Sequence, residues 1–297
     1  MRMSFPAVLT GHRTLRHAAA GLALTALSLS TLAAGFEKGP NPTATSLEQM
    51  GPFTLGTAKL PSSADYNSST VIYYPTDASA GSFGLVVLCP GFVSSGALYS
   101  GIAKRIASHG FVVAQMDTKS LFDQPIARGK QIVAVMNAVL AQNKTAAVVY
   151  AGKVDEGRVA FMGHSAGGAG TFYAGATNPQ VKALVGLMAG QPGSNFSAFQ
   201  GIRIPSLLLT AENDGLASAW AEPYYAQLDA SLPAARIEMK GMGHLSLWTT
   251  ATQASQGKVA KYATAWVKRF VDEDIRYTPF ISTKAADMSD FETHANY

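Results

Sequence analysis

Short apolar runs recur along the chain, and stretches with the periodicity of a helix separate them. The clearest run, FGLVVLC at 83–89, contains no polar residue, which is typical of a strand buried on both faces of a sheet. The strands that such runs predict lie at 70–75, 83–89, 111–118, 158–163, 181–189, 205–211 and 236–240.

The segments between these runs carry apolar residues on one helical face. In 96–109, Leu98, Ile102 and Ile106 lie four residues apart, and Gly110 predicts the end of the helix. The helices predicted in this way lie at 96–109, 128–143, 217–232 and 255–274, with one more starting at Ser165. Because strands and helices alternate, we expect an α/β fold with a mostly parallel central sheet and helices on both faces.

The first residues carry a different pattern. Three arginines within the first sixteen residues precede an apolar stretch, 18–34, that ends in small residues. This order is typical of a secretory signal peptide and predicts cleavage after Ala33 or Ala34; an uncleaved anchor is the alternative. We expect residues 1–34 to be the signal peptide and 35–297 to form a single catalytic domain, secreted to the periplasm or the exterior without a stable membrane anchor.

Charge and cysteine content narrow the choice of partners. The chain has 23 basic and 19 acidic residues, and three of the basic ones lie in the predicted signal peptide, so the remainder carries a net charge of +1. This balance argues against a nucleic-acid partner, and we expect a monomer. The single cysteine, Cys89, excludes an intramolecular disulfide and is expected to be a small buried hydrophobic residue.

The strand at 158–163 runs into the motif Gly-His-Ser-Ala-Gly at 163–167. Gly-x-Ser-x-Gly between a strand and a helix predicts a nucleophile elbow, a sharp turn that exposes a serine above a helix N-terminus. The bare motif occurs by chance in roughly one such chain in five, so its weight comes from the flanking strand and helix. A glycine-rich turn with an idle serine is the alternative. We expect Ser165 to be the nucleophile and the N–H of Ala166 to be one donor of an oxyanion hole.

A serine nucleophile needs a base, and the base needs an acid that orients it. His244 lies in a glycine-flanked loop after the last predicted strand, which is where this fold places the base. Of the other histidines, His164 is expected to point away from the serine hydroxyl, His109 to cap a helix or lie on the surface, and His294 to lie idle in a polar tail.

The orienting acid should lie between the serine and the base in the chain. Asp214 follows the apolar strand at 205–211 within the turn sequence ENDG, and a short carboxylate there can be directed at an imidazole. Glu212 is the alternative acid. The second oxyanion donor is expected to be the N–H of Phe92, which follows the strand that ends at Cys89, and its ring is expected to line the acyl pocket.

Several short motifs make the chain resemble the bacterial cutinases and polyester hydrolases, including the poly(ethylene terephthalate) hydrolases. These motifs are GPNPT (39–43), YYPT (73–76), PGF (90–92), ASHGFVV (107–113), DQP (123–125), GHSAGG (163–168), NFS (195–197), END (212–214), GH (243–244) and KRFVDEDIRYTPF (268–280). The resemblance implies an α/β-hydrolase fold, secretion and ester hydrolysis. It also assigns the triad to Ser165, Asp214 and His244, and the oxyanion donors to Phe92 and Ala166.

The chain departs from the pattern of this group at its binding cleft. Ala166 stands where methionine is usual, and the group's cleft tryptophan has only Gly190 or Gln191 in its place. We expect Leu216 to form an apolar wall of the substrate site, with His164 and Phe92 beside it. Trp248 either replaces the missing tryptophan or packs in the core.

These observations predict a secreted serine carboxylic-ester hydrolase that requires no metal or organic cofactor. Its expected substrates are short- to medium-chain esters, either small molecules or polyesters. The alternatives are a small-molecule carboxylesterase or acylglycerol lipase without polymer activity, a non-catalytic hydrolase-like binding module, and an enzyme for amide hydrolysis or acyl transfer.

Overall fold

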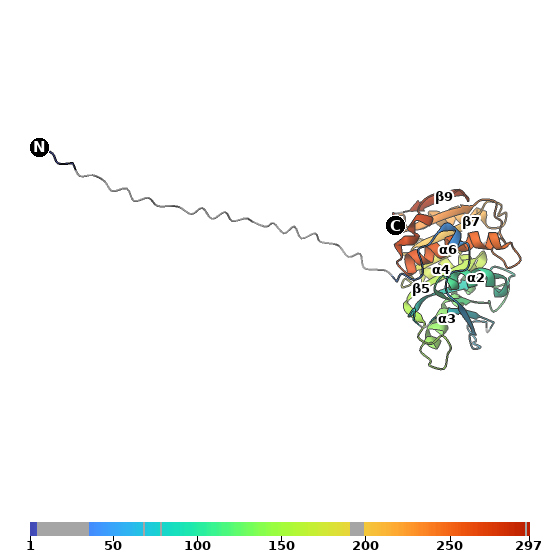
Figure 1. Ribbon diagram of the computed structural model, residues 1–297. Helices are drawn as coiled ribbons and strands as arrows, with labels where there is room; N and C mark the ends of the chain where they lie inside the picture. Colours follow the sequence, from blue (N-terminus) through green and yellow to red (C-terminus); the bar gives the residue numbers. More distant parts are fainter. Residues whose placement is uncertain (5–35, 68, 78, 191–198, 295) are drawn as a thin grey trace. The chain divides into compact units, whose positions relative to one another are not determined.

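A nine-stranded sheet runs through the described part of the chain, in the order β1-β2-β4-β3-β5-β6-β7-β8-β9 (Figure 1). The computed structural model describes residues 1–4, 36–67, 69–77, 79–190, 199–294 and 296–297. The predicted signal peptide therefore lies almost entirely outside the described residues, and the sheet belongs to the unit Ala34–Tyr297. The strands are β1 (Leu55–Lys59), β2 (Val71–Pro75), β3 (Phe83–Cys89), β4 (Phe111–Gln115), β5 (Val154–His164), β6 (Ala183–Leu187), β7 (Ser206–Ala211), β8 (Ala234–Met239) and β9 (Met288–His294).

The centre of the sheet is parallel. Parallel pairs join β4 to β3, β3 to β5, β5 to β6, β6 to β7 and β7 to β8, whereas β1, β2 and β9 make antiparallel pairs at the two edges. The mostly parallel α/β sheet is confirmed. The helices between the strands are α1 (Ala44–Leu47), α2 (Ser100–Ser108), α3 (Pro125–Asn143), α4 (Ala166–Ala176), α5 (Ser218–Ala226) and α6 (Gln253–Val271), with 3-10 helices at Gly96–Tyr99 and Ile275–Phe280.

Helices cover both faces of the sheet, and the apolar side chains of β3 contribute to the core on each face. Successive side chains of a strand point to opposite faces. Val86 and Leu88 belong to the core layer that contains residues of α2 and α6, whereas Val87 and Cys89 belong to the layer with residues of α3, α4 and α5. All seven residues of β3 are buried, as its continuous apolar sequence predicts. Burial raises the pKa of the Cys89 thiol to about 12, so this side chain behaves as a hydrophobic residue.

Three local expectations differ from the structure. The tail expected to be polar and idle forms β9, and His294 is its last residue; the strand pairs with β8 through its backbone, so its sequence need not be apolar. The helix expected at 217–232 ends at Ala226. His109 is the C-cap residue of α2, as one of the two alternatives predicted, but it does not lie on the surface, since only 6% of it is exposed. Its Nε2 bonds to the carbonyl of Gln49, in the segment between α1 and β1.

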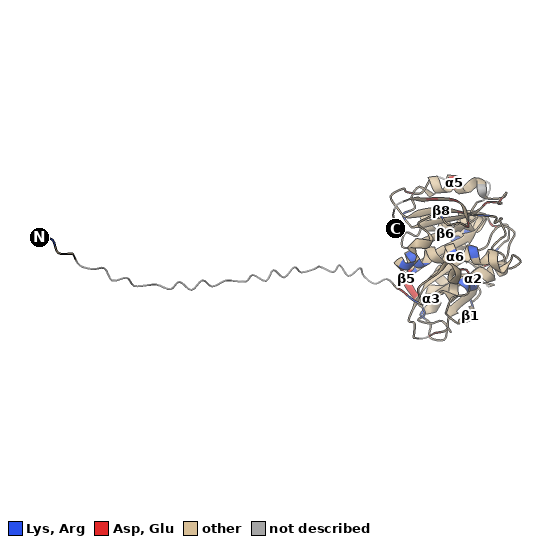
Figure 2. Ribbon diagram, turned by 45° about the horizontal axis from the view of Figure 1, so that its top comes forward, with Lys and Arg blue, Asp and Glu red and all other residues tan. Residues whose placement is uncertain are grey.

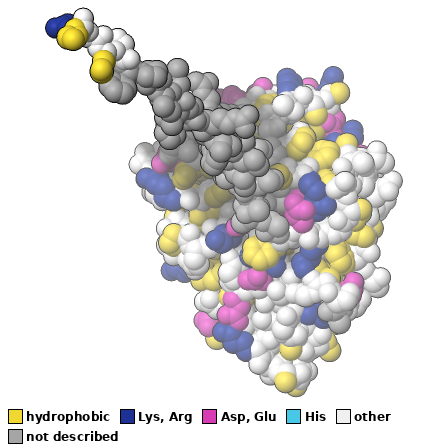
Figure 3. Space-filling view, turned by 60° about the vertical axis from the view of Figure 1, so that its left-hand side comes forward, with side chains coloured by type: hydrophobic (Ala, Val, Ile, Leu, Met, Phe, Trp, Pro, Cys, Tyr) yellow, Lys and Arg dark blue, Asp and Glu magenta, His cyan; other side chains and the backbone are white. Residues whose placement is uncertain are grey.

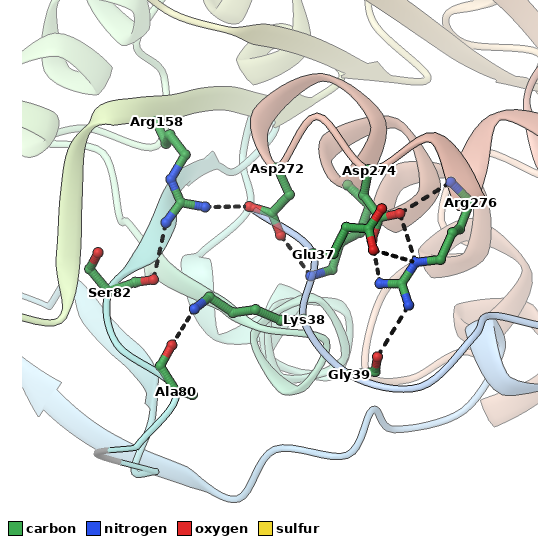
Figure 4. Close-up of polar contacts among 10 residues, drawn as sticks. Glu37, Lys38, Gly39, Ala80, Ser82, Arg158, Asp272, Asp274 and Arg276 are labelled. Carbon is green, nitrogen blue, oxygen red and sulfur yellow. Dashed lines mark hydrogen bonds and ion pairs between the residues drawn. The ribbon is translucent and has the colours of Figure 1, made fainter. Parts of the chain in front are cut away.

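The motifs near the two ends of the domain contact each other. The Arg276 guanidinium bonds to the carbonyl of Gly39 (Figure 4). It also bonds to the side chain of Asn41, and together these contacts join the motif at 268–280 to the motif at 39–43. Beneath this contact, the carboxylate of Asp272 accepts hydrogen bonds from Arg158 at 2.8 Å and from Lys268 at 2.7 Å. Arg158 also donates to the carbonyl of Ser82, beside the amino end of β3, so this network lies at the opposite end of that strand from the site described next.

Lys, Arg, Asp and Glu residues are scattered over the described elements (Figure 2), and on the face in Figure 3 basic and acidic side chains lie close together. This distribution accords with the small net charge calculated from the sequence. Within the described ranges, no helix combines the length and the apolar character needed to cross a membrane.

Candidate active site

The candidate site lies where the central strands end. In a parallel sheet the carboxyl ends of the strands lie together, and ligands of open α/β sheets bind just beyond these carboxyl ends. Phe92 follows β3, Ser165 follows β5, Asp214 follows β7 and His244 follows β8. Residues that are up to 152 positions apart in the chain thus reach one end of the sheet, because β3 is next to β5, β7 is next to β8, and only β6 lies between the two pairs.

Ser165 occupies a strained turn between β5 and α4. Its backbone angles, φ 52° and ψ −121°, lie in a region that residues other than glycine rarely adopt. The turn leaves no space on either side, because a Cβ atom at Gly163 would lie 2.3 Å from the Gly167 carbonyl oxygen, and one at Gly167 would lie 2.3 Å from that of Pro90. The two glycines of the motif are therefore required by packing, as a nucleophile elbow predicts.

Asp214 and His244 form a directed pair. His244 Nδ1 lies 2.8 Å from Asp214 Oδ2, while Asp214 Oδ1 accepts the backbone N–H groups of Leu216 at 2.8 Å and Ala217 at 2.9 Å. Burial alone would raise the pKa of Asp214, but the hydrogen bonds from His244 and the two N–H groups outweigh it and hold the pKa below its usual value. The carboxylate therefore stays charged and fixes the proton of His244 on Nδ1, which leaves Nε2 to accept a proton.

The alternative acid, Glu212, has a different partner. Its Oε2 accepts the backbone N–H of Gly241 at 2.7 Å, and the residue is exposed. In the described part of the chain, the imidazole of His244 is thus bonded to Asp214 and not to Glu212.

A cavity of about 700 Å³ opens beside this pair and beside Ser165. Its lining includes all the predicted pocket residues together with four residues that the sequence did not single out, namely Val93, Ser94, Gln124 and Leu245. The lining residues are Phe92, Val93, Ser94, Gln124, His164, Ser165, Gly190, Leu216, His244, Leu245 and Trp248. Of the residues missed, Gln124 had a signal, since it is the glutamine of the DQP motif. Among the described residues no hydrogen bond joins the Ser165 hydroxyl to His244, and such bonds commonly tighten only when substrate binds.

Two backbone N–H groups are available at the base of the cavity. Ala166 is the first residue of α4, where an amide has no partner within its own helix. The amide of Phe92 has no hydrogen-bond partner in the described residues, although both amides beside it do: Gly91 N–H bonds to the Tyr99 hydroxyl, and Val93 N–H to the Leu121 carbonyl, each at 2.9 Å. The loop thus leaves one amide free between two fixed ones.

His164 lies beneath the cavity and is almost completely buried, with 1% of its surface exposed. Its Nδ1 lies 2.7 Å from the Tyr99 hydroxyl and its Nε2 lies 2.9 Å from the His244 carbonyl, so neither ring nitrogen is free for a substrate. Burial, together with the nearby His244 side chain, lowers the pKa of His164 to about 3, and the ring is therefore neutral at physiological pH.

Comparison with known proteins shows the family of this chain. Residues 30–296 match the family model described as PET hydrolase-like. The chain belongs to the PET hydrolase-like family. Its similarity extends to a bis(hydroxyethyl) terephthalate hydrolase of Streptomyces coelicolor, 35% identical over 251 residues, which cover 83% of this chain and 76% of that protein.

Two cutinases show the same degree of similarity. A cutinase of Thermobifida fusca is 35% identical over 272 residues, which cover 89% of this chain and 86% of that protein. Cutinase est2 of Thermobifida alba is 33% identical over 265 residues, with coverage of 87% and 84%. The resemblance to cutinases and polyester hydrolases is confirmed.

The place of the missing cleft tryptophan is described only at Gly190, since Gln191 lies outside the described residues. A Cβ atom at Gly190 would lie within 3.0–3.2 Å of three atoms of Trp220, a residue of α5. A side chain at position 190 would therefore require Trp220 to shift. Trp248 lines the cavity, but it also packs against the core, and its Nε1 is buried without a hydrogen-bond partner among the described residues.

The side chains that bind metals do not cluster in the described part of the chain: no group of three or more His, Cys, Asp or Glu residues there is arranged to hold an ion.

Proposed function

We propose that the chain is a secreted serine carboxylic-ester hydrolase of the cutinase type, which acts on short- to medium-chain esters and on polyesters. The observation that carries the proposal is the 2.8 Å bond between His244 Nδ1 and Asp214 Oδ2 at the edge of a cavity that Ser165 also lines. A buried carboxylate that fixes the tautomer of an imidazole near a serine is the arrangement that activates a serine hydroxyl.

In the proposed reaction, His244 Nε2 takes the proton of the Ser165 hydroxyl as the serine oxygen attacks the ester carbonyl carbon. The N–H groups of Phe92 and Ala166 stabilise the negative charge on the carbonyl oxygen. The C–O bond to the alcohol then breaks, and the alcohol leaves with the proton from His244. A water molecule, deprotonated by the same imidazole, attacks the acyl-enzyme, and the carboxylic acid leaves as Ser165 regains its proton.

The walls of the cavity support an apolar acyl or polymer chain as substrate. Around its mouth lie exposed apolar side chains: Phe92, Val93, Leu216 and Leu245 in the lining, and Phe122 against the Phe92 ring at 5.8 Å between centroids. Exposed apolar groups that gather at one site mark a binding surface. This surface favours polyesters alongside soluble esters.

Three measurements test the proposal. Hydrolysis of p-nitrophenyl esters of increasing chain length should be fast for the wild type and should fall to background in Ser165→Ala. The wild type should also release soluble product from a polyester film. Ester activity without film products would favour a small-molecule carboxylesterase, and wild-type activity equal to that of Ser165→Ala would favour a non-catalytic binding module.

The export part of the proposal is tested separately. The basic start and the apolar stretch at 18–34 support secretion. Expression of the whole chain in a bacterium should deliver a product outside the cytoplasm whose first residue is Ala34 or Gly35. An intact N-terminus on a protein retained in the cytoplasm would contradict export.

A further inference from the structure

Three hydroxyl and imidazole groups form a buried chain beneath the cavity. The Tyr99 hydroxyl lies 2.9 Å from the Gly91 nitrogen, 3.0 Å from Ser94 Oγ and 2.7 Å from His164 Nδ1. Ser94 Oγ donates to the Gly91 carbonyl at 2.8 Å. The side chains are nearly inaccessible to solvent, with 0% of Tyr99, 1% of His164 and 2% of Ser94 exposed. A buried network of this kind is costly unless every member is satisfied.

The direction of the hydrogen bonds follows from the partners at each end. The His244 carbonyl can only accept, so His164 Nε2 carries the hydrogen and donates to it. The neutral ring then has no hydrogen on Nδ1, which must accept the Tyr99 hydroxyl hydrogen. The opposite tautomer would set two acceptors, Nε2 and the His244 carbonyl oxygen, 2.9 Å apart. Tyr99 Oη then accepts the Gly91 N–H. Because the single hydroxyl hydrogen of Ser94 points to the Gly91 carbonyl, the 3.0 Å contact between Ser94 Oγ and Tyr99 Oη carries no hydrogen.

This chain fixes both sides of the peptide group that carries the proposed oxyanion donor. The Gly91 carbonyl and the Phe92 N–H belong to one planar peptide unit and point in opposite directions. When Ser94 holds the carbonyl, it also sets the direction of the Phe92 N–H. Tyr99 holds the preceding amide, that of Gly91. The packing allows little movement, because a Cβ atom at Gly91 would lie 2.9 Å from His164 Nδ1 and 3.1 Å from Ser165 Cβ.

We infer that Tyr99 and Ser94 are positioning residues that orient the Gly91–Phe92 peptide, so that the Phe92 N–H meets the oxyanion. The inference rests on the proposed ester hydrolysis. Through His164, the same chain also ties this loop to the backbone of His244. The loop that holds the oxyanion donor and the loop that holds the base are therefore connected through buried side chains that take no part in the proposed proton transfer.

The test is Tyr99→Phe, which removes one oxygen and keeps the ring. It leaves the Gly91 N–H and His164 Nδ1 without their partner. Complete loss of an oxyanion donor lowers kcat by about 10²–10³-fold, so a misdirected donor should lower it about 10- to 100-fold while KM changes by less than about twofold. Active sites are first counted by titration with a p-nitrophenyl phosphonate, so that kcat refers to folded enzyme.

Two further readouts separate positioning from a loss of structure. The acidic midpoint of the pH–kcat/KM profile should stay that of the wild type, because Asp214 and His244 are untouched. Binding of an alkyl boronic acid, whose tetrahedral adduct places an oxygen in the oxyanion hole, should weaken by the same factor as kcat. The matched control is Tyr262→Phe, which deletes another buried tyrosine hydroxyl, bonded to Asp287 at 2.5 Å, and should leave kcat unchanged.

Ser94→Ala provides a second, smaller perturbation if Tyr99→Phe does not fold, and it too should lower kcat with little effect on KM. The inference is overturned if both variants keep wild-type kcat, if their loss lies in KM, or if the pH midpoint moves with the loss. A wild type no more active than Ser165→Ala would instead overturn the proposed function, and this result is independent of either variant.

Discussion

The buried ion network around Asp272 should make one substitution, Asp272→Asn, strongly destabilising. Asp272 is fully buried and accepts hydrogen bonds from Arg158 at 2.8 Å and from Lys268, itself fully buried, at 2.7 Å. Asp272→Asn keeps the shape of the side chain but removes the carboxylate that pairs with the buried Lys268. Arg158 loses one of its two carboxylate partners and keeps the other, Asp155, at 2.9 Å. Breaking a buried ion pair by removing one partner costs about 3–5 kcal/mol, and we expect a loss of this size in the free energy of unfolding.

The assay is urea unfolding at pH 7, followed by tryptophan fluorescence and by circular dichroism. The matched control is Asp290→Asn, since Asp290 pairs with Arg236 at 2.5 Å but has 47% of its side chain exposed. Exposed pairs contribute about 0–1 kcal/mol. A loss for Asp272→Asn no larger than the loss for Asp290→Asn would refute the claim that burial gives this network its importance.

Three further predictions concern the elbow, the acid sensitivity of the fold and the mouth of the cavity. Gly163→Ala forces a backbone collision and should abolish both folding and activity, whereas Gly201→Ala, which meets nothing within 4 Å, should be silent in expression and activity assays. Burial lowers the pKa of His109 to about 4, so the unfolded chain binds a proton at higher pH than the folded chain does. As the pH falls from 6.5 to 4.5, this group should therefore lower the free energy of unfolding by about 2 kcal/mol. In urea titrations, His109→Asn should reduce this dependence on pH. Phe122→Ser should reduce film hydrolysis several-fold and leave soluble-ester kinetics unchanged, with Val149→Ser, an equally exposed apolar site, as the control; equal losses on both substrates would argue against a docking role.

The sequence predicted the sheet best where a strand is buried on both faces. The predicted segment 83–89 coincides with β3, because a run of apolar residues has no other stable place in a mostly parallel sheet. The same reasoning missed β9, whose sequence MSDFETH has the polarity of a tail. An edge strand is held mainly by backbone hydrogen bonds to its neighbour, and these leave no pattern in the side chains.

The candidate site shows a similar division. Short motifs and the order of residues along the chain predict Ser165, Asp214 and His244, and both can be read from the sequence alone. Tyr99 reads as one more apolar residue in the segment 96–109, and nothing in the sequence pairs it with His164, 65 positions later. Only the parallel register of β3 with β5, which aligns Cys89 with Gly163, brings the two loops together.

In the described residues, backbone strain is concentrated at the carboxyl ends of the central strands, beside the candidate site. Four non-glycine residues in the described ranges have positive φ, and three of them, Val93, Ser165 and Met188, follow β3, β5 and β6, which are adjacent in the sheet. Each such conformation costs about 1–3 kcal/mol and persists only where neighbouring contacts enforce it. Here each of the three N–H groups is bonded to a backbone carbonyl, at 2.7–2.9 Å. Since Val93 is β-branched, the residue type least suited to this region, the loop conformation beside Phe92 is imposed by these contacts and not by local preference.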